Sequence, residues 1–217
     1  MSVAAKICGL NDETGIRAAI RGGARFVGFV FYEPSPRRVT PEHAASLAAL
    51  VPKGIRKVGL FVDADDSAID AALATVPLDM LQFHGTESPA RVAVAKRRWN
   101  LPVMKAIAIA AREDLDLARN YLAVADCLLF DAKPPPDSAG ALPGGNGLAF
   151  DWALLGEREW PLPWMLSGGL TADNLGDAVR ITHAKSVDVS SGVEMRPGTK
   201  DAAKIDAFLA AAIAVEW

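Results

Sequence analysis

The residues of this chain that could do chemistry begin with a free thiol and a carboxylate. Cys8 ends the apolar segment 3–8 beside Gly9, and Asp131 ends the apolar segment 127–131. A thiolate can remove a proton and a carboxyl group can donate one, so the pair points to acid–base catalysis. Each residue also has an ordinary interpretation. A free cysteine is usually a small buried residue, and an aspartate before a proline-rich loop can cap that loop.

A lysine lies two residues before this thiol. In a strand Lys6 and Cys8 point to the same side, with Lys6 deeper in the structure. A nearby ammonium group lowers the pKa of a thiol and favours the reactive thiolate. If Cys8 points into the barrel mouth, Lys6 lies below it in the interior; the sequence leaves open whether Lys6 lowers the pKa of Cys8 in this way. The second cysteine, Cys127, begins its apolar segment instead of ending it, and we assign it to the core.

Two glycine-containing turns could bind a phosphate group. Glycine lets the backbone N–H groups of a turn approach an anion without a Cβ in the way. One such turn alone is more often only a tight turn, but here two of them follow the last two apolar segments. We expect them to bind phosphate together, through Ser167, Gly168, Gly169, Ser190, Ser191 and Gly192.

Three further side chains are candidates for contact with a substrate. Gln82 and His84 alternate along one segment and so share a face, although a lone histidine is often structural. Arg37 lies in a proline-rich loop, and its planar guanidinium could bind a carboxylate through two hydrogen bonds. An exposed loop arginine, however, is more often only solvated.

Asp188 is a fourth candidate, and its position gives it two interpretations. It lies inside an apolar segment, where a carboxylate is costly unless it is paired. It could contact the substrate, or it could pair with an interior lysine such as Lys6 or Lys105. Its place within the segment favours the paired role.

The hydrophobic pattern predicts the elements that must position these side chains. Short apolar segments alternate with amphipathic, alanine-rich stretches, and this alternation indicates parallel strands with right-handed helical crossovers. We predict strands at 3–8, 26–31, 57–62, 80–84, 103–107, 127–131, 164–167 and 187–190. We predict helices at 12–21, 41–50, 69–75, 90–99, 113–122, 150–155, 172–181 and 201–215.

Eight strand–helix units predict an α/β protein, a single (β/α)8 TIM barrel that spans residues 1–217. In this architecture the active site lies at the C-terminal ends of the strands, where the candidate side chains are expected. The longest connection, 133–147, is rich in Pro and Gly and is expected to be a lid over the site.

The composition and the net charge indicate which kinds of binding partner and which compartment to expect. Of the 217 residues 51% are hydrophobic, and the formal net charge of −3 argues against nucleic acid or an anionic membrane as the main partner. No stretch resembles a signal peptide or a membrane span, and two cysteines suit a reducing compartment, so we expect a cytoplasmic protein. Because neither metal-ligand spacing nor a dinucleotide fingerprint occurs, we expect no metal and no cofactor.

The motifs follow one another in a fixed order along the whole chain. They are Lys-Ile-Cys-Gly at 6–9, Gly-Phe-Val-Phe-Tyr-Glu-Pro-Ser-Pro-Arg at 28–37, Gly-Leu-Phe-Val at 59–62, Leu-Asp-Met-Leu-Gln-Phe-His-Gly at 78–85, Leu-Phe-Asp at 129–131, Gly-Gly-Asn-Gly-Leu-Ala-Phe-Asp-Trp at 144–152, Leu-Ser-Gly-Gly-Leu at 166–170 and Val-Asp-Val-Ser-Ser-Gly-Val-Glu at 187–194. In this order they resemble the phosphoribosylanthranilate isomerase family of tryptophan biosynthesis. The departures are small: Phe83 replaces a usual leucine, Ala132 a threonine, and Asn146 a serine or threonine.

The resemblance implies an Amadori rearrangement of N-(5-phosphoribosyl)anthranilate to 1-(2-carboxyphenylamino)-1-deoxyribulose 5-phosphate, without a cofactor. It implies that Cys8 is the general base and Asp131 the general acid. It also implies that Arg37 contacts the anthranilate carboxylate and that the two glycine-containing turns hold the phosphate. The expected partner is this small phosphosugar, and the chain is expected to be a monomer or a homodimer.

Two alternatives remain open at this point. A histidine-pathway or dual-substrate phosphoribosyl aminoaldose isomerase resembles this chain in reaction, but that family has a carboxylate at the position of Cys8. Its substrate also carries a second phosphate, for which the sequence offers no clear counterpart. A non-catalytic phosphosugar-binding barrel is the other alternative, and such a protein would need neither Cys8 nor Asp131.

Overall fold

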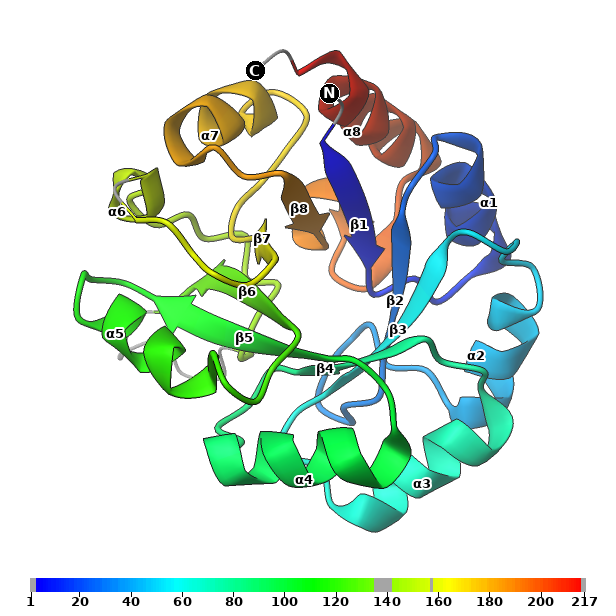
Figure 1. Ribbon diagram of the computed structural model, residues 1–217. Helices are drawn as coiled ribbons and strands as arrows, with labels where there is room; N and C mark the ends of the chain where they lie inside the picture. The colour runs from blue at the N-terminus through cyan, green and yellow to red at the C-terminus, as the bar shows by residue number, and fades with distance from the viewer. Residues whose placement is uncertain (1–2, 135–141, 157, 216–217) are drawn as a thin grey trace.

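Eight short apolar segments form the parallel strands of a closed barrel in the computed structural model, which describes residues 3–134, 142–156 and 158–215. The strands follow one another around the barrel in sequence order, with the helices outside them (Figure 1). They are β1 (Ala4–Cys8), β2 (Phe26–Val30), β3 (Arg56–Phe61), β4 (Met80–Phe83), β5 (Val103–Ile109), β6 (Cys127–Ala132), β7 (Trp164–Leu166) and β8 (Ser186–Val189). The predicted TIM barrel is confirmed.

The helices between the strands begin where the sequence offers a cap. Thr40 accepts a hydrogen bond from the backbone N–H of His43, and Ser88 accepts one from that of Arg91, each just before a proline in the first turn. The helices are α1 (Glu13–Arg21), α2 (Pro41–Ala48), α3 (Asp66–Thr75), α4 (Pro89–Trp99), α5 (Asp114–Ala118) with the 3-10 turn η1 (Arg119–Tyr121), α6 (Ala153–Gly156), α7 (Leu175–Thr182) and α8 (Ala202–Ala214).

The side chains of the barrel interior form two layers with different chemistry. Because side chains alternate along a strand, every second residue points inward. At the N-terminal end of the strands these residues are apolar and buried: Val58, Met80, Met104, Ala106, Cys127, Leu129 and Met165. Cys127 thus belongs to the core, as predicted. Toward the C-terminal end the inward residues include the polar Lys6, Gln82, Asp131 and Asp188 beside the apolar Val30 and Leu60, and this is the end where the site forms.

The structure differs from the prediction by more than one residue at the starts of three helices. The predicted helix 69–75 begins earlier, at Asp66, because the carboxylate of Asp65 accepts a hydrogen bond from the backbone N–H of Ala68 and caps the helix there. The predicted helix 150–155 is only the short α6, because the carboxylate of Asp151 caps Ala153 and starts the helix late. The predicted helix 172–181 starts at Leu175 instead. The side chain of Asn174 accepts a hydrogen bond from the backbone N–H of Thr171 and donates one to the carbonyl of Gly169, so this stretch is held as a loop.

The segment that follows β8 contains three short elements that were not predicted. After β8 the chain forms a 3-10 turn, η2 (Ser191–Val193), and then an antiparallel hairpin of β9 (Glu194–Arg196) and β10 (Thr199–Lys200). Its turn packs on the loop after β2, since a Cβ on Gly198 would lie 2.3 Å from the carbonyl oxygen of Pro36. The hairpin therefore places its side chains beside Arg37.

Within the described ranges, no helix has both the length and the apolar character required to cross a membrane.

Candidate active site

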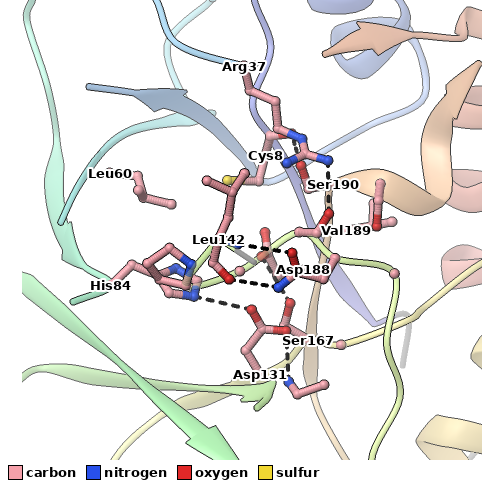
Figure 2. Close-up of a pocket in the computed structure, with 18 of the residues that line it drawn as sticks. Cys8, Arg37, Leu60, His84, Asp131, Leu142, Ser167, Asp188, Val189 and Ser190 are labelled. Carbon is pink, nitrogen blue, oxygen red and sulfur yellow. Dashed lines mark hydrogen bonds and ion pairs between the residues drawn. The ribbon is translucent and has the colours of Figure 1, made fainter. Parts of the chain in front are cut away.

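A single pocket at the C-terminal ends of the strands gathers the predicted catalytic pair. Cys8 comes from β1 and Asp131 from β6, and Figure 2 shows them on opposite sides of the pocket. Arg37 lies on the Cys8 side of this view, whereas His84 and Ser167 lie on the Asp131 side. The pocket encloses about 720 Å³, counting the part open to solvent, which is the size expected for a small-molecule site.

Beneath the thiol lies an ion pair in the barrel interior. The ammonium of Lys6 donates to the carboxylate of Asp188 at 2.9 Å, and both side chains are buried. Lys6 and Asp188 are register partners where β1 meets β8, so the pair spans the seam that closes the barrel. The hydroxyl of Ser167 also donates to Asp188, at 3.3 Å. Of the two lysines considered for Asp188, Lys6 is the partner, while Lys105 pairs with Glu87.

Burial has a larger effect on the pKa of Cys8 than the charge of Lys6 has. Burial raises the pKa of Cys8 above its usual value of 9.0, although the nearby charge of Lys6 lowers it. Lys6 therefore does lower the pKa of the thiol, but by less than the cost of removing a thiolate from water raises it. Lys6 itself keeps its proton: burial lowers its pKa, but the charges of Asp188 and Cys8 raise it further.

Asp131 is held by a short chain of hydrogen bonds. Its Oδ2 lies 3.2 Å from Nε2 of His84, and its Oδ1 accepts a hydrogen bond from the backbone N–H of Ala132. On the other side of the imidazole, the amide nitrogen of Gln82 donates to Nδ1 of His84 at 2.9 Å. The N–H at Nε2 then points at Asp131, whose carboxylate accepts it. Gln82 and His84 share a face, as predicted; His84 lines the pocket and contacts Asp131, whereas Gln82 contacts His84 and is not among the residues that line the pocket.

The two turns proposed for phosphate come together at one wall of the pocket. All six predicted residues line it: Ser167, Gly168, Gly169, Ser190, Ser191 and Gly192. Gly168 and Gly169 have φ angles of +91° and +65°, which other residues rarely adopt. Gly192 packs so tightly on the neighbouring turn that a Cβ there would lie 1.9 Å from the carbonyl oxygen of Leu170. Without the glycine at position 192 the two turns could not approach each other this closely.

Arg37 is buried, so its interpretation as a solvated loop residue is wrong. Its aliphatic stem packs on Gly9, where a Cβ would lie 2.7 Å from Cδ of the arginine. Its guanidinium does hold a carboxylate through two hydrogen bonds, but this carboxylate belongs to Glu194: Nε to Oε1 is 2.8 Å and Nη2 to Oε2 is 2.9 Å. Nη1 has no hydrogen-bond partner among the described residues, and Arg37 lines the pocket.

Sequence reasoning missed two buried charged residues next to this arginine. Glu194 and Lys200 face each other across the unpredicted hairpin, and Nζ of Lys200 lies 2.8 Å from Oε1 of Glu194. The Pro197–Gly198 pair, a common turn signal, was the feature that could have revealed the hairpin. A charged residue in such a short element is by default expected at the surface.

The loop predicted to be a lid is described only in part. Residues 135–141 of the predicted 133–147 segment lie outside the described residues. Its C-terminal part, from Leu142 to Gly147, lines the pocket. Gly144 sits directly against the catalytic candidates, since a Cβ there would lie 2.6 Å from Nε2 of His84 and 2.7 Å from Oδ2 of Asp131. This part of the loop forms a wall of the site.

The family of the chain follows from a comparison with known proteins. The model of the family N-(5'phosphoribosyl)anthranilate (PRA) isomerase matches residues 5–211. The chain belongs to this family. A curated relative, the N-(5'-phosphoribosyl)anthranilate isomerase of Paracoccus denitrificans, is 58% identical over 214 residues, which is 99% of each chain. The protein is therefore an enzyme, an isomerase of the TIM-barrel class.

Solved structures of PRA isomerases have the same fold. The phosphoribosyl anthranilate isomerase from Thermotoga maritima is 33% identical and superimposes with a TM-score of 0.85, covering 97% of this chain and 98% of that one. A second structure of such an isomerase holds reduced 1-(o-carboxyphenylamino)-1-deoxyribulose 5-phosphate; it is 31% identical, with a TM-score of 0.81 and the same coverage. The site described above thus lies in a PRA isomerase barrel.

Proposed function

We propose that this chain catalyses the rearrangement of N-(5'-phosphoribosyl)anthranilate to 1-(2-carboxyphenylamino)-1-deoxyribulose 5-phosphate, with Cys8 as the base and Asp131 as the acid. The supporting observation is the position of these two groups on opposite sides of one pocket. The same pocket carries glycine-rich turns suited to phosphate and a buried arginine suited to a carboxylate. PRA isomerases act in tryptophan biosynthesis, and this enzyme has that role.

The first step belongs to Asp131. Its protonated carboxyl group gives a proton to the ring oxygen of the ribose, and the ring opens to an iminium ion. The hydrogen bonds that Asp131 accepts from His84 and from the backbone N–H of Ala132 then stabilise the carboxylate that remains. His84 is a positioning residue in this scheme, and Gln82 holds its imidazole in the required tautomer.

The second step belongs to Cys8. The iminium makes the proton on C2 acidic, and the thiolate of Cys8 removes it, leaving an enolamine that tautomerises to the ketone. The buried ammonium of Lys6 favours the thiolate, which opposes the effect of burial. A well-placed acid or base of this kind contributes roughly 10²–10⁴-fold in rate. The proton from C2 ends on sulfur, and the one from Asp131 ends on the former ring oxygen.

In this proposal two separate parts of the pocket bind the two ends of the substrate, the phosphate and the anthranilate carboxylate, and neither end is the reacting carbon C2. We assign the phosphate to the turns that contain Gly168, Gly169 and Gly192, and the carboxylate to Arg37. This leaves C2 between the sulfur and the carboxyl group, which is how fixed geometry contributes to catalysis. Asp188 pairs with Lys6 below the site, and it also lines the pocket, so we keep it among the substrate-facing residues.

A fluorescence assay tests the proposal. Phosphoribosylanthranilate is generated in the cuvette and its fluorescence is followed as the purified protein is added. We expect rapid loss of the signal with the parent chain, and a decrease in kcat of about 10²-fold or more for both Cys8→Ser and Asp131→Asn, with smaller changes in product binding. Product binding without any turnover by the parent chain would instead support a non-catalytic phosphosugar-binding barrel. A kcat that either substitution leaves unchanged would remove that residue from the mechanism.

Three broader proposals accompany this function. We propose that residues 1–217 form one catalytic domain and that it works in the cytoplasm, where its two free thiols would stay reduced. We further propose that it is a monomer or a homodimer. Sedimentation analysis over a range of concentrations distinguishes these two states, and a larger assembly would contradict both.

A further inference from the structure

A buried group of three charges lies beside the pocket, and the mechanism above does not use all of it. The carboxylate of Glu194 contacts two cations at once: Arg37, at 2.8 and 2.9 Å, and Lys200, at 2.8 Å. The exposed fractions of the three side chains are 4%, 6% and 0%. Burial of charge is costly unless each group is paired, so this arrangement requires an explanation.

The geometry at the guanidinium shows what Glu194 does to Arg37. It engages Nε and Nη2, and Nη2 also donates to the carbonyl of Gly145 at 3.0 Å. Because the guanidinium is planar, two hydrogen bonds to one carboxylate fix its orientation. The remaining nitrogen, Nη1, has no hydrogen-bond partner among the described residues. It lies beside Gly145, where a Cβ would lie 2.5 Å away, and it is the group left for a ligand in the pocket that Arg37 lines.

Through Lys200, the same carboxylate is also linked to the turn after β8. Lys200 donates to the carbonyl and to the hydroxyl of Ser190, at 2.9 and 3.2 Å, and the Ser190 hydroxyl donates to the carbonyl of Cys8 at 3.1 Å. Glu194 therefore connects the arginine to a phosphate turn and to the strand that carries the base. Although burial alone would raise the pKa of Glu194, the hydrogen bonds and charges of Arg37 and Lys200 hold it below its usual 4.5, so it stays ionised.

We propose that Glu194 is a positioning and specificity-determining residue, which orients Arg37 so that the site prefers a substrate with an aromatic carboxylate. This inference rests on the proposed function. One carboxylate faces two cations here, so the group retains an excess positive charge when all three are ionised. An incoming carboxylate at Nη1 compensates that charge, whereas an aniline analogue without the carboxylate leaves it uncompensated.

Two ligands that differ only in this carboxylate test the proposal. The reduced product analogue, 1-(o-carboxyphenylamino)-1-deoxyribitol 5-phosphate, is compared with its counterpart made from aniline, and the dissociation constant of each is measured by calorimetry. The parent protein should prefer the carboxylate-bearing ligand. Glu194→Asp keeps the charge but shortens the reach, and it should reduce this preference about tenfold or more, because misplacement by about an ångström can cost up to 10²-fold.

Glu194→Gln separates orientation from charge. If Glu194 orients Arg37, both Glu194→Asp and Glu194→Gln reduce the preference, while binding of the aniline analogue changes little. If Glu194 acts only as a repulsive charge, Glu194→Gln increases the preference instead, which overturns the proposal. Equal weakening of both ligands indicates a merely structural role and also overturns it.

Two further variants serve as controls. One removes a carboxylate at the surface, and the other tests whether Glu194 acts through Arg37. Glu33→Gln is the matched control, because Glu33 pairs with Arg38 at the surface of the same loop and should leave the preference unchanged. Arg37→Lys removes the two-point contact, so adding Glu194→Asp to it should have almost no further effect on the preference. An additive effect would contradict the inference. If the parent chain shows neither turnover nor any preference, the proposed function fails first, and that outcome is distinct from these.

Discussion

At the level of single residues, the surroundings of Cys8 determine whether this side chain is a neutral thiol or a thiolate. A cysteine that removes a proton from a carbon atom must be in its thiolate form. Cys8, however, is only 4% exposed, and its burial favours the neutral thiol. Lys6 opposes this effect, and Asp188, which also lies near, supports it. If Cys8 is the base, as we propose, the activity of the free enzyme should rise with pH, because a larger fraction of Cys8 is deprotonated as the pH approaches its raised pKa.

Alkylation of Cys8 as a function of pH measures this balance. We expect a midpoint above 9.0 in the parent protein and a still higher one in Lys6→Met, because the variant loses the positive charge that favours the thiolate. In Lys6→Met/Asp188→Asn the midpoint should fall back part of the way, since the unpaired carboxylate is also removed. Lys53→Met, at an exposed lysine, is the control. An unchanged midpoint in Lys6→Met would mean that the ion pair does not influence the thiol.

At the scale of elements, the two phosphate turns depend on one close contact. Gly192, in η2 after β8, lies against the carbonyl of Leu170, so any side chain at this position must push the two turns apart. The conformation of Gly192 itself is not left-handed, so the effect of a substitution comes from the contact alone.

Gly192→Ala should raise KM for the phosphorylated substrate about tenfold or more, because its methyl group displaces the backbone that would bind phosphate. The control is Gly176→Ala in α7, where a Cβ meets nothing within 4 Å and the helix should gain about 0.5–1 kcal/mol of stability. Steady-state kinetics and inhibition by inorganic phosphate check both variants. The same KM and phosphate inhibition in Gly192→Ala as in the parent would place the phosphate elsewhere.

The elements also show how far the sequence could predict this protein. The strands were predicted to within a few residues, because each combines an apolar run with a helix on either side. The placement of Cys8, Asp131 and His84 followed, since the ends of parallel strands meet at one edge of a barrel. The hairpin of β9 and β10 has strands too short for any alternation to be recognised. Its residues Glu194 and Lys200 were missed for that reason, since only tertiary contacts bury them.

In the molecule as a whole, the N-terminal end of the barrel contributes mainly to stability, and the C-terminal end contains the proposed active site. The apolar layer at the N-terminal end of the barrel contains Met104, which is fully buried, while the catalytic candidates lie at the opposite end. The Lys6–Asp188 pair lies between the two, across the strand seam that closes the barrel. The two ends should therefore respond separately to substitution.

Met104→Ala tests this division. It removes a buried side chain and should lower the free energy of unfolding by about 2–5 kcal/mol, as measured by urea denaturation. The kcat of the folded variant should stay close to that of the parent, since Met104 is not among the residues that line the pocket. Leu117→Ala, at a side chain that is 53% exposed, should change stability by only about 0.5 kcal/mol or less. A large fall in kcat for Met104→Ala would show that the two ends are coupled.

The two thiols lie at opposite ends of the barrel interior, so chemical labelling of each can report a different property of the protein. Cys8 lines the open pocket, whereas Cys127 lies in the apolar layer, where burial raises its pKa to about 12. One cysteine-selective reagent, read out by peptide mass spectrometry, therefore gives two signals from one sample. We expect label on Cys8 alone to report a folded molecule with an empty site, bound ligand to suppress that label, and label on both cysteines to report molecules that have opened their core. Occupancy and unfolding can thus be followed together, without adding a probe to the chain.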